Sequence, residues 1–170
     1  MKNVLIVSAT LNSNYKLAND ISKIVEIDKN IQSNVISLED YMLPIYTDSN
    51  LEEHKIEYAE VTNKLISHFS KSNAIIFCAP EYNGSIPPIL NNAFAWISTN
   101  TKNWREAFDG KFAFIATSSG GPGNKFLISL RIQLEHLGMI VYPRTINISK
   151  SKPLDFHNVE KILKQFINLL

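Results

Sequence analysis

Short apolar runs alternate along the chain with segments in which apolar residues recur every three or four positions. The runs at residues 4–7 and 74–79 are continuous, which is typical of strands buried on both faces of a parallel sheet. Further strand patterns cover residues 34–38, 111–117 and 139–148. The first of these is weak, which favours a strand at the edge of the sheet.

Helical spacing of apolar residues follows each predicted strand. Residues 43–51 are predicted to form a loop, and residues 51–70 a single helix with Ile56, Leu65, Ile66 and Phe69 as its apolar contacts. The other predicted helices carry these apolar positions: Leu17, Ile21, Ile24 and Val25; Ile89, Ala93, Trp96 and Ile97; Leu127, Leu130 and Leu134; Val159, Ile162, Leu163, Phe166, Ile167 and Leu170.

Five strands that each precede a helix predict an α/β protein with a parallel sheet and helices on both faces. Right-handed crossovers leave few arrangements at this length, and the strand order 2-1-3-4-5 is the favoured one. The chain shows no internal repeat and no low-complexity tract, so we expect one domain that spans residues 1–170.

Composition narrows the possible functions. The chain is 45% hydrophobic, so we expect a sizeable core. It has 17 Lys and Arg against 16 Asp and Glu, so we do not expect a large basic face that binds nucleic acid. One cysteine excludes a disulfide framework, and four scattered histidines predict no metal site. No apolar run reaches about 18 residues, so we expect a cytoplasmic protein with no membrane or nucleic-acid partner.

Ligands of such sheets bind beyond the carboxyl ends of the strands, at the switch point between strands 1 and 3. The loop after the first strand is rich in hydroxyls and amides at a helix N-terminus, where a phosphate binds well: Ser8, Thr10, Asn12, Ser13 and Asn14. Helix capping is the alternative explanation for these residue types. The loop contains no glycine, so it is neither a Walker loop nor a GxGxxG turn.

The loops after the third and fourth predicted strands are also unusual. The first of them is rigid and carries an aromatic ring and an amide, which suits a flat, hydrogen-bonding ligand: Pro80, Glu81, Tyr82, Asn83 and Gly84. The second lets backbone N–H groups approach a ligand: Ser118, Ser119, Gly120 and Gly121. An ordinary strand-to-helix turn and a flexible loop are the respective alternatives.

Together these loops resemble those of a known family, the NAD(P)H-dependent FMN reductases of the flavodoxin-like superfamily, which includes azoreductase- and quinone-reductase-type enzymes. Residues 79–93, which begin Ala-Pro-Glu-Tyr-Asn-Gly-Ser, are similar to its signature, and residues 116–121 to its second flavin loop. Order and spacing agree from residue 3 to about residue 148. Residues 7–14 depart from the pattern, because the family's phosphate loop usually contains Gly and Arg and this one contains neither.

The resemblance implies a flavodoxin-like three-layer sandwich that binds FMN and uses NADPH or NADH as hydride donor, with a flavin, quinone or azo compound as small-molecule acceptor. It implies that the phosphate is held by Ser8, Thr10, Asn12, Ser13 and Asn14. It also implies that residues 80–83 line the flavin ring largely through their backbone, and that residues 118–121 approach the ring or the ribityl chain from the other side. No side-chain acid or base is obligatory, so no catalytic residue is assigned. A homodimer or homotetramer, in which a neighbouring subunit completes the site, is also implied.

Two other functions remain open on the sequence. A flavodoxin-like electron carrier is the first, although carriers tend to be strongly acidic and this chain has a net charge of +1. A family member that has lost its flavin is the second, because the phosphate loop lacks an Arg. Cys78 is predicted to be a buried apolar residue, and Glu39 and Asp40 to lie in a solvated turn.

Overall fold

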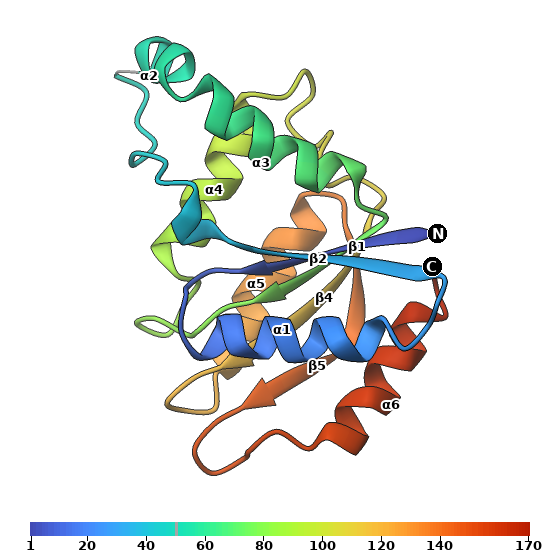
Figure 1. The fold of residues 1–170 in the computed structure, drawn as a ribbon. Helices are drawn as coiled ribbons and strands as arrows, with labels where there is room; N and C mark the ends of the chain where they lie inside the picture. The colour runs from blue at the N-terminus through green and yellow to red at the C-terminus, as the bar shows by residue number, and fades with distance from the viewer. Residues whose placement is uncertain (50) are drawn as a thin grey trace.

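The computed structural model describes residues 1–49 and 51–170, so Asn50, in the predicted loop, lies outside the described residues. Within them, a five-stranded sheet has the order β2-β1-β3-β4-β5, and all neighbouring strands are parallel (Figure 1). The strands are β1 (Lys2–Ser8), β2 (Ile31–Ser37), β3 (Ala74–Cys78), β4 (Phe112–Ser118) and β5 (Ile140–Ile148). This confirms the predicted fold class and strand order.

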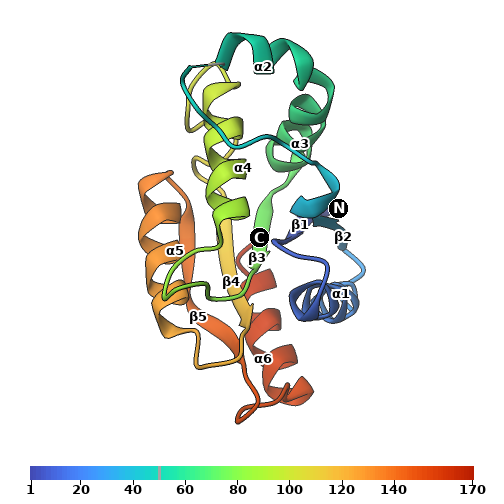
Figure 2. The ribbon, with the colours of Figure 1, turned by 90° about the vertical axis from the view of Figure 1, so that its left-hand side faces the viewer.

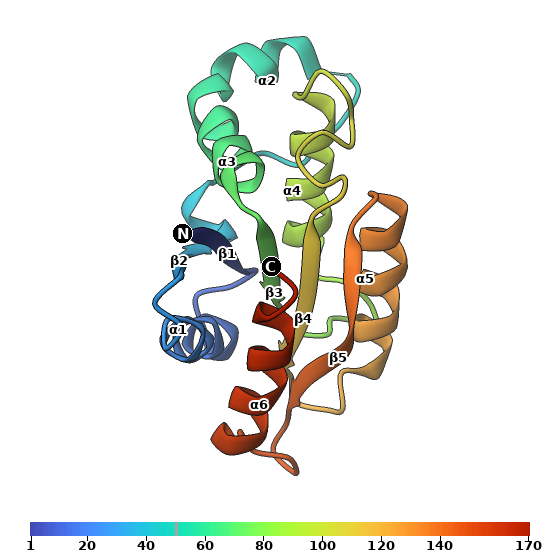
Figure 3. The same ribbon diagram turned by 90° about the vertical axis from the view of Figure 1, so that its right-hand side faces the viewer.

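The helices form a layer on each face of the sheet, as Figures 2 and 3 show. On one face lie α1 (Ser13–Val25) and α6 (Phe156–Ile167). On the other lie α3 (Ala59–Lys71), α4 (Pro88–Thr99) and α5 (Asn124–His136). Two short helices, α2 (Leu51–Glu57) and the 3-10 helix η1 (Leu38–Asp40), precede α3.

The two helical layers explain the continuous apolar runs of the sequence. In β1, Val4 and Ile6 belong to the core beneath α1 and α6, whereas Leu5 and Val7 belong to the core beneath α3, α4 and α5. All five residues of β3 are buried in the same alternating way. Because both faces of these strands need apolar side chains, the usual alternation of polar and apolar residues is absent.

Two predicted elements differ from the structure. The strand predicted at residues 34–38 covers Ile31–Ser37, because Ile31 is buried beneath α1 and pairs with Lys2 at the edge of the sheet. The helix predicted at residues 51–70 is two helices, α2 and α3, which meet at Tyr58. The prediction of Ile56 as a core contact is wrong, since this side chain is 81% exposed.

Three aromatic rings pack together at the break between α2 and α3. The ring of Tyr58 contacts those of His54 and Trp96, with centroids 5.9 and 6.4 Å away, and His54 also lies 6.2 Å from Trp96. Beside these rings, α2 lies across the ends of α3 and α4, beyond the sheet (Figure 2). None of the helices in the described part of the chain has the length and apolar character of a membrane-spanning segment.

Candidate functional site

The three predicted site loops meet at one end of the sheet. β1, β3 and β4 are neighbours and parallel, so their carboxyl ends lie side by side. Two backbone hydrogen bonds continue the ladders into the loops: Ala9 N donates to Cys78 O at 2.9 Å, and Ala79 N donates to Ala116 O at 3.2 Å. This is the switch point of the sheet, where ligands of this architecture bind.

Side chains of the first loop shape its backbone. The Ser8 hydroxyl is buried and donates to Thr10 O at 2.7 Å, and the Thr10 hydroxyl donates to Asn12 Oδ1 at 2.7 Å. Asn12 is the N-cap of α1, because its Oδ1 also accepts a hydrogen bond from Asn14 N. The capping interpretation therefore holds for Asn12, and the hydroxyls of Ser8 and Thr10 are occupied within the loop.

The loop nevertheless leaves backbone donors open. Thr10, Asn12 and Ser13 have N–H groups that donate to no acceptor within the described residues. These groups lie at the N-terminus of a 13-residue helix, where the aligned peptide dipoles favour a negative charge. A set of free N–H donors at a helix start is the chemistry that a phosphate group requires. The first loop therefore fits the phosphate of FMN without a guanidinium.

Asn14 links the first loop to the third. This side chain is fully buried; its Oδ1 accepts from Ser118 N and its Nδ2 donates to Ser118 O, both at 2.9 Å. The two residues are 104 positions apart in the chain. The amide of Asn14 is therefore engaged with Ser118, and its contribution to the site is to hold the two loops together.

The second loop ends in a tight hairpin. Tyr82 N donates to Ser85 O at 3.1 Å, and Ser85 N donates to Tyr82 O at 2.9 Å. Between them, Asn83 and Gly84 have φ angles of 49° and 70°, as a type I′ turn requires. Tyr82 and Asn83 are exposed at the tip of this hairpin, and Pro80 is buried at its base. The hairpin thus offers a rigid aromatic and amide surface beside the sheet.

Glu81 joins the second loop to the third. Its N–H donates to Ser119 Oγ at 2.9 Å, and its carboxylate accepts from Lys125 N at 3.0 Å and from Phe126 N at 3.1 Å. The last two donors belong to the first turn of α5, so Glu81 caps this helix with a charge of the favourable sign. The side chain of Glu81 points to α5, and its backbone is the part that faces the loop.

The third loop presents open backbone. Gly120 and Gly121 are exposed, and no atom lies within 4 Å of the position that a Cβ would take at either residue. Their N–H groups also donate to no acceptor within the described residues. The neighbouring Ser119 hydroxyl is held by Thr117 Oγ1 at 2.9 Å. A flat ligand can therefore approach the backbone of this loop without meeting a side chain.

Glu39 corrects a prediction from the sequence. Its carboxylate Oε2 accepts a hydrogen bond from Leu11 N, in the first loop, at 2.8 Å, so Glu39 does not lie in a purely solvated turn. The 3-10 helix η1 places it at the carboxyl end of β2, which is the neighbour of β1. Asp40, the next residue, is exposed as expected. The only sequence signal for this contact is the position of Glu39 after a strand adjacent to β1.

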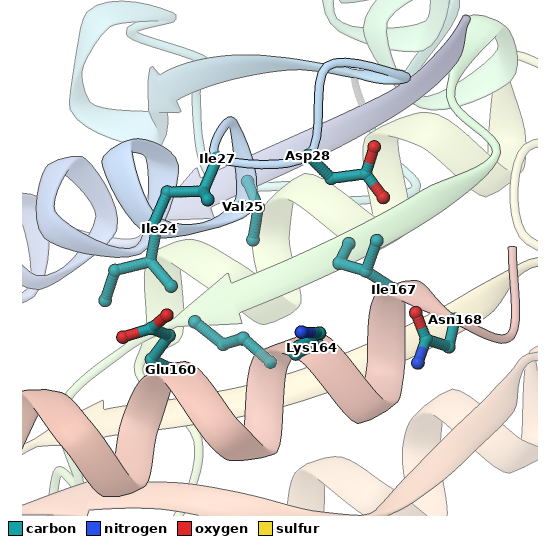
Figure 4. A pocket seen from close by; sticks show the side chains of 9 residues that line it. Ile24, Val25, Ile27, Asp28, Glu160, Lys164, Ile167 and Asn168 are labelled. Atoms are coloured by element: carbon teal, nitrogen blue, oxygen red, sulfur yellow. The ribbon is translucent and has the colours of Figure 1, made fainter.

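Two hollows of the surface differ in their relation to these loops. A groove of about 440 Å³ begins beside the first loop and runs between α1 and the segment after β5; it is lined by Ser13, Lys16, Leu17, Asp20, Ser118, Ile148, Pro153, Leu154 and Phe156. A cavity of about 270 Å³ lies between the last turns of α1 and α6 (Figure 4). Because α1 runs back along the sheet from the first loop, this cavity lies at the opposite end.

A parallel sheet in the order 2-1-3-4-5, with free backbone N–H groups in the loop after β1 and open polar loops after β3 and β4, defines a flavodoxin-like α/β protein. Residues 1–153 match the family model of the NADPH-dependent FMN reductases. The chain belongs to this family. Membership implies FMN as the cofactor and a reduced nicotinamide as the electron donor.

Solved structures share the whole fold at low sequence identity. FerB, a flavoenzyme NAD(P)H:(acceptor) oxidoreductase from Paracoccus denitrificans, has a TM-score of 0.78 and 20% identity, covering 99% of this chain and 96% of its own. The apo form of an NADH:FMN oxidoreductase (EMOB) has a TM-score of 0.76 and 16% identity, and the match covers 100% of this chain and 90% of that one. An azoreductase from Bacillus anthracis strain Sterne has a TM-score of 0.62 and 16% identity, and the match covers 99% of this chain and 96% of that one.

A curated relative from Mycoplasma pneumoniae, the uncharacterized protein MG342 homolog, is 25% identical over 101 residues. The match covers 56% of this chain and 59% of the relative. The chain thus matches less than two thirds of the length of that relative.

Proposed function

We propose that this chain is an NAD(P)H-dependent FMN oxidoreductase that passes electrons from a nicotinamide to a small-molecule acceptor: a flavin, a quinone or an azo compound. The observation that carries the proposal is the set of free backbone N–H groups in the first and third loops, at residues 10, 12, 13, 120 and 121. These donors belong to loops at the switch point of the sheet, in a chain of the FMN reductase family.

In this proposal the N–H groups of Thr10, Asn12 and Ser13 hold the phosphate of FMN, and the flavin ring lies between the 82–85 hairpin and the third loop. When bound, FMN supplies the hydride and electron transfer. The chain itself positions the cofactor. N–H donors of Gly120 and Gly121 beside the ring would stabilise negative charge there.

We further propose that the protein works as a homodimer or homotetramer whose neighbouring subunit completes the flavin site. The family resemblance supports this assembly. Exposed Ile128 and Ile132, four residues apart on α5, supply apolar surface that an assembly would cover. Light scattering measures the mass of the particle, and a monomer at micromolar concentration would contradict this part of the proposal.

The first experiment is a visible spectrum of the purified protein with FMN, followed by anaerobic addition of NADPH or NADH. Rapid bleaching of a protein-bound flavin band is the expected result. A bound flavin that stays oxidised would refute the reductase and leave an electron carrier. Absence of any bound flavin would refute both. Steady-state oxidation of NAD(P)H with a free flavin, a quinone and an azo dye then identifies the acceptor.

Gly120→Val provides a matched variant for the same experiment. Nothing lies within 4 Å of a Cβ at Gly120, and its φ is not in the left-handed region, so the fold tolerates the side chain. Valine would occupy space that the flavin ring needs. FMN occupancy is therefore expected to fall while the melting temperature stays close to that of the wild-type protein.

A further inference from the structure

Glu39 places a negative charge against the loop that is proposed to hold the flavin phosphate. Its carboxylate accepts from Leu11 N at 2.8 Å, and Leu11 lies between Thr10 and Asn12, whose N–H groups have no acceptor within the described residues. One donor in the run of residues 10–13 is thus already taken by an anion of the protein. A phosphate at this loop would be a close neighbour of the carboxylate.

Within the described residues, no Lys or Arg side chain forms a hydrogen bond or an ion pair with residues 8–14. All three arginines of the sequence are engaged elsewhere. Arg105 lies over the ring of Trp104, Arg131 donates to carbonyls of β5, and Arg144 donates to Gln165. Lys16, in the first turn of α1, is exposed and donates no hydrogen bond to this loop in the described residues.

The negative charge of Glu39 would repel FMN, which carries a phosphate, and would not repel riboflavin, which has none. The phosphate of FMN carries between one and two negative charges at neutral pH, whereas riboflavin has the same ring and ribityl chain without it. If Glu39 keeps its bond to Leu11, it repels the phosphate; if it turns to solvent, it gives up that bond. Both alternatives weaken FMN binding and leave riboflavin binding unchanged.

We propose that Glu39 is a specificity-determining residue, which weakens the preference of the site for FMN over riboflavin. This inference rests on the proposed function, because it requires that the three loops bind a flavin. Two charges several ångströms apart at a protein surface interact by an amount equivalent to roughly tenfold in affinity. Riboflavin, which has no phosphate, is expected to lose no affinity to the charge of Glu39.

The test compares Glu39→Gln with Asp40→Asn. Glutamine keeps a side-chain oxygen for Leu11 N and removes the charge, whereas Asp40 is exposed and makes no described hydrogen bond to the loop. Dissociation constants for FMN and riboflavin are measured by quenching of flavin fluorescence. Glu39→Gln is expected to bind FMN roughly tenfold more tightly, with riboflavin unchanged and Asp40→Asn close to the wild type. High salt should reduce the difference in the dissociation constant for FMN between Glu39→Gln and the wild-type protein, because it screens the charge of Glu39.

Three results would overturn the inference: no change for FMN, an equal change for both flavins, or an equal effect of Asp40→Asn. A second variant, Glu39→Ala, gives the same comparison if the glutamine protein does not fold. If none of the proteins binds either flavin, the proposed function fails as well. If Glu39→Gln binds both flavins with the same ratio of dissociation constants as the wild-type protein, the role of Glu39 is refuted and the proposed function stands.

Discussion

Replacing Asn14 by alanine tests how the site loops are held together. The buried amide of Asn14 pairs with both the N–H and the C=O of Ser118 at 2.9 Å. Two lost hydrogen bonds cost about 1 kcal/mol each, and partly buried groups left without partners cost about 1–3 kcal/mol more. We expect the free energy of unfolding to fall by about 3–5 kcal/mol, and the melting temperature of a chain of this size to fall by about 6–20 °C.

The assay is urea denaturation followed by circular dichroism, with Asn19→Ala as the control. Asn19 lies on the same helix and makes one local hydrogen bond, from its Nδ2 to Tyr15 O at 2.8 Å. Its loss is expected to cost about 1 kcal/mol or less. Asn14→Asp keeps an acceptor for Ser118 N but loses the donor to Ser118 O, so this variant should also be destabilised.

Flavin binding provides the second measurement on Asn14→Ala. If the amide holds the first and third loops at the correct separation, the affinity for FMN falls under conditions in which the variant is still folded. The reasoning is refuted if Asn14→Ala loses no more stability than Asn19→Ala. An unchanged affinity for FMN in a destabilised Asn14→Ala protein would refute the link to the site.

Two further predictions concern stability. Gly123 has a φ of +65°, and a Cβ there would lie 2.9 Å from Thr117 Cγ2. Gly123→Ala should therefore lower the free energy of unfolding by about 1–3 kcal/mol, whereas Gly120→Ala should change it little, and urea denaturation of the two variants measures the difference. Burial first, and then Lys64 and Lys71, lower the pKa of His68. The unfolded state therefore binds a proton more readily, and stability should fall as the pH drops through the range below about 6.5. His68→Gln should reduce this dependence in unfolding measurements between about pH 5 and 7.5, and an unchanged slope would contradict the assignment.

The strands could be predicted because the sheet is covered on both faces. Residues 74–79 form one apolar run because β3 has α-helices on each side, and this strand together with four further strand patterns, separated by helical spacing, leaves one favoured strand order. The break between α2 and α3 could not be predicted in this way. Apolar spacing continues across Tyr58, and one of the rings that pack against Tyr58 there, that of Trp96, comes from α4.

The positions of the site loops could be predicted, but the partners of their side chains could not. Hydroxyl and amide residue types after β1, β3 and β4 indicate a polar site at the switch point. No local pattern shows that Asn14 pairs with Ser118 or that Glu39 reaches Leu11, because these contacts join residues 104 and 28 positions apart. Only the packing of β1 between β2 and β3 brings the two contacts to one place.

The hydrogen bonds divide the polar residues of the site into two groups with different tasks. The side chains of Ser8, Asn14 and Ser119 bind other parts of the loops, and that of Glu81 caps α5, so these four side chains form a scaffold. Backbone N–H groups of residues 10, 12, 13, 120 and 121 remain free for a ligand. Backbone donors can hold a phosphate without the Arg that the family's loop usually carries, because the helix dipole supplies part of the positive field. That field is weaker than a guanidinium, so a single carboxylate such as Glu39 can change which flavin the site prefers.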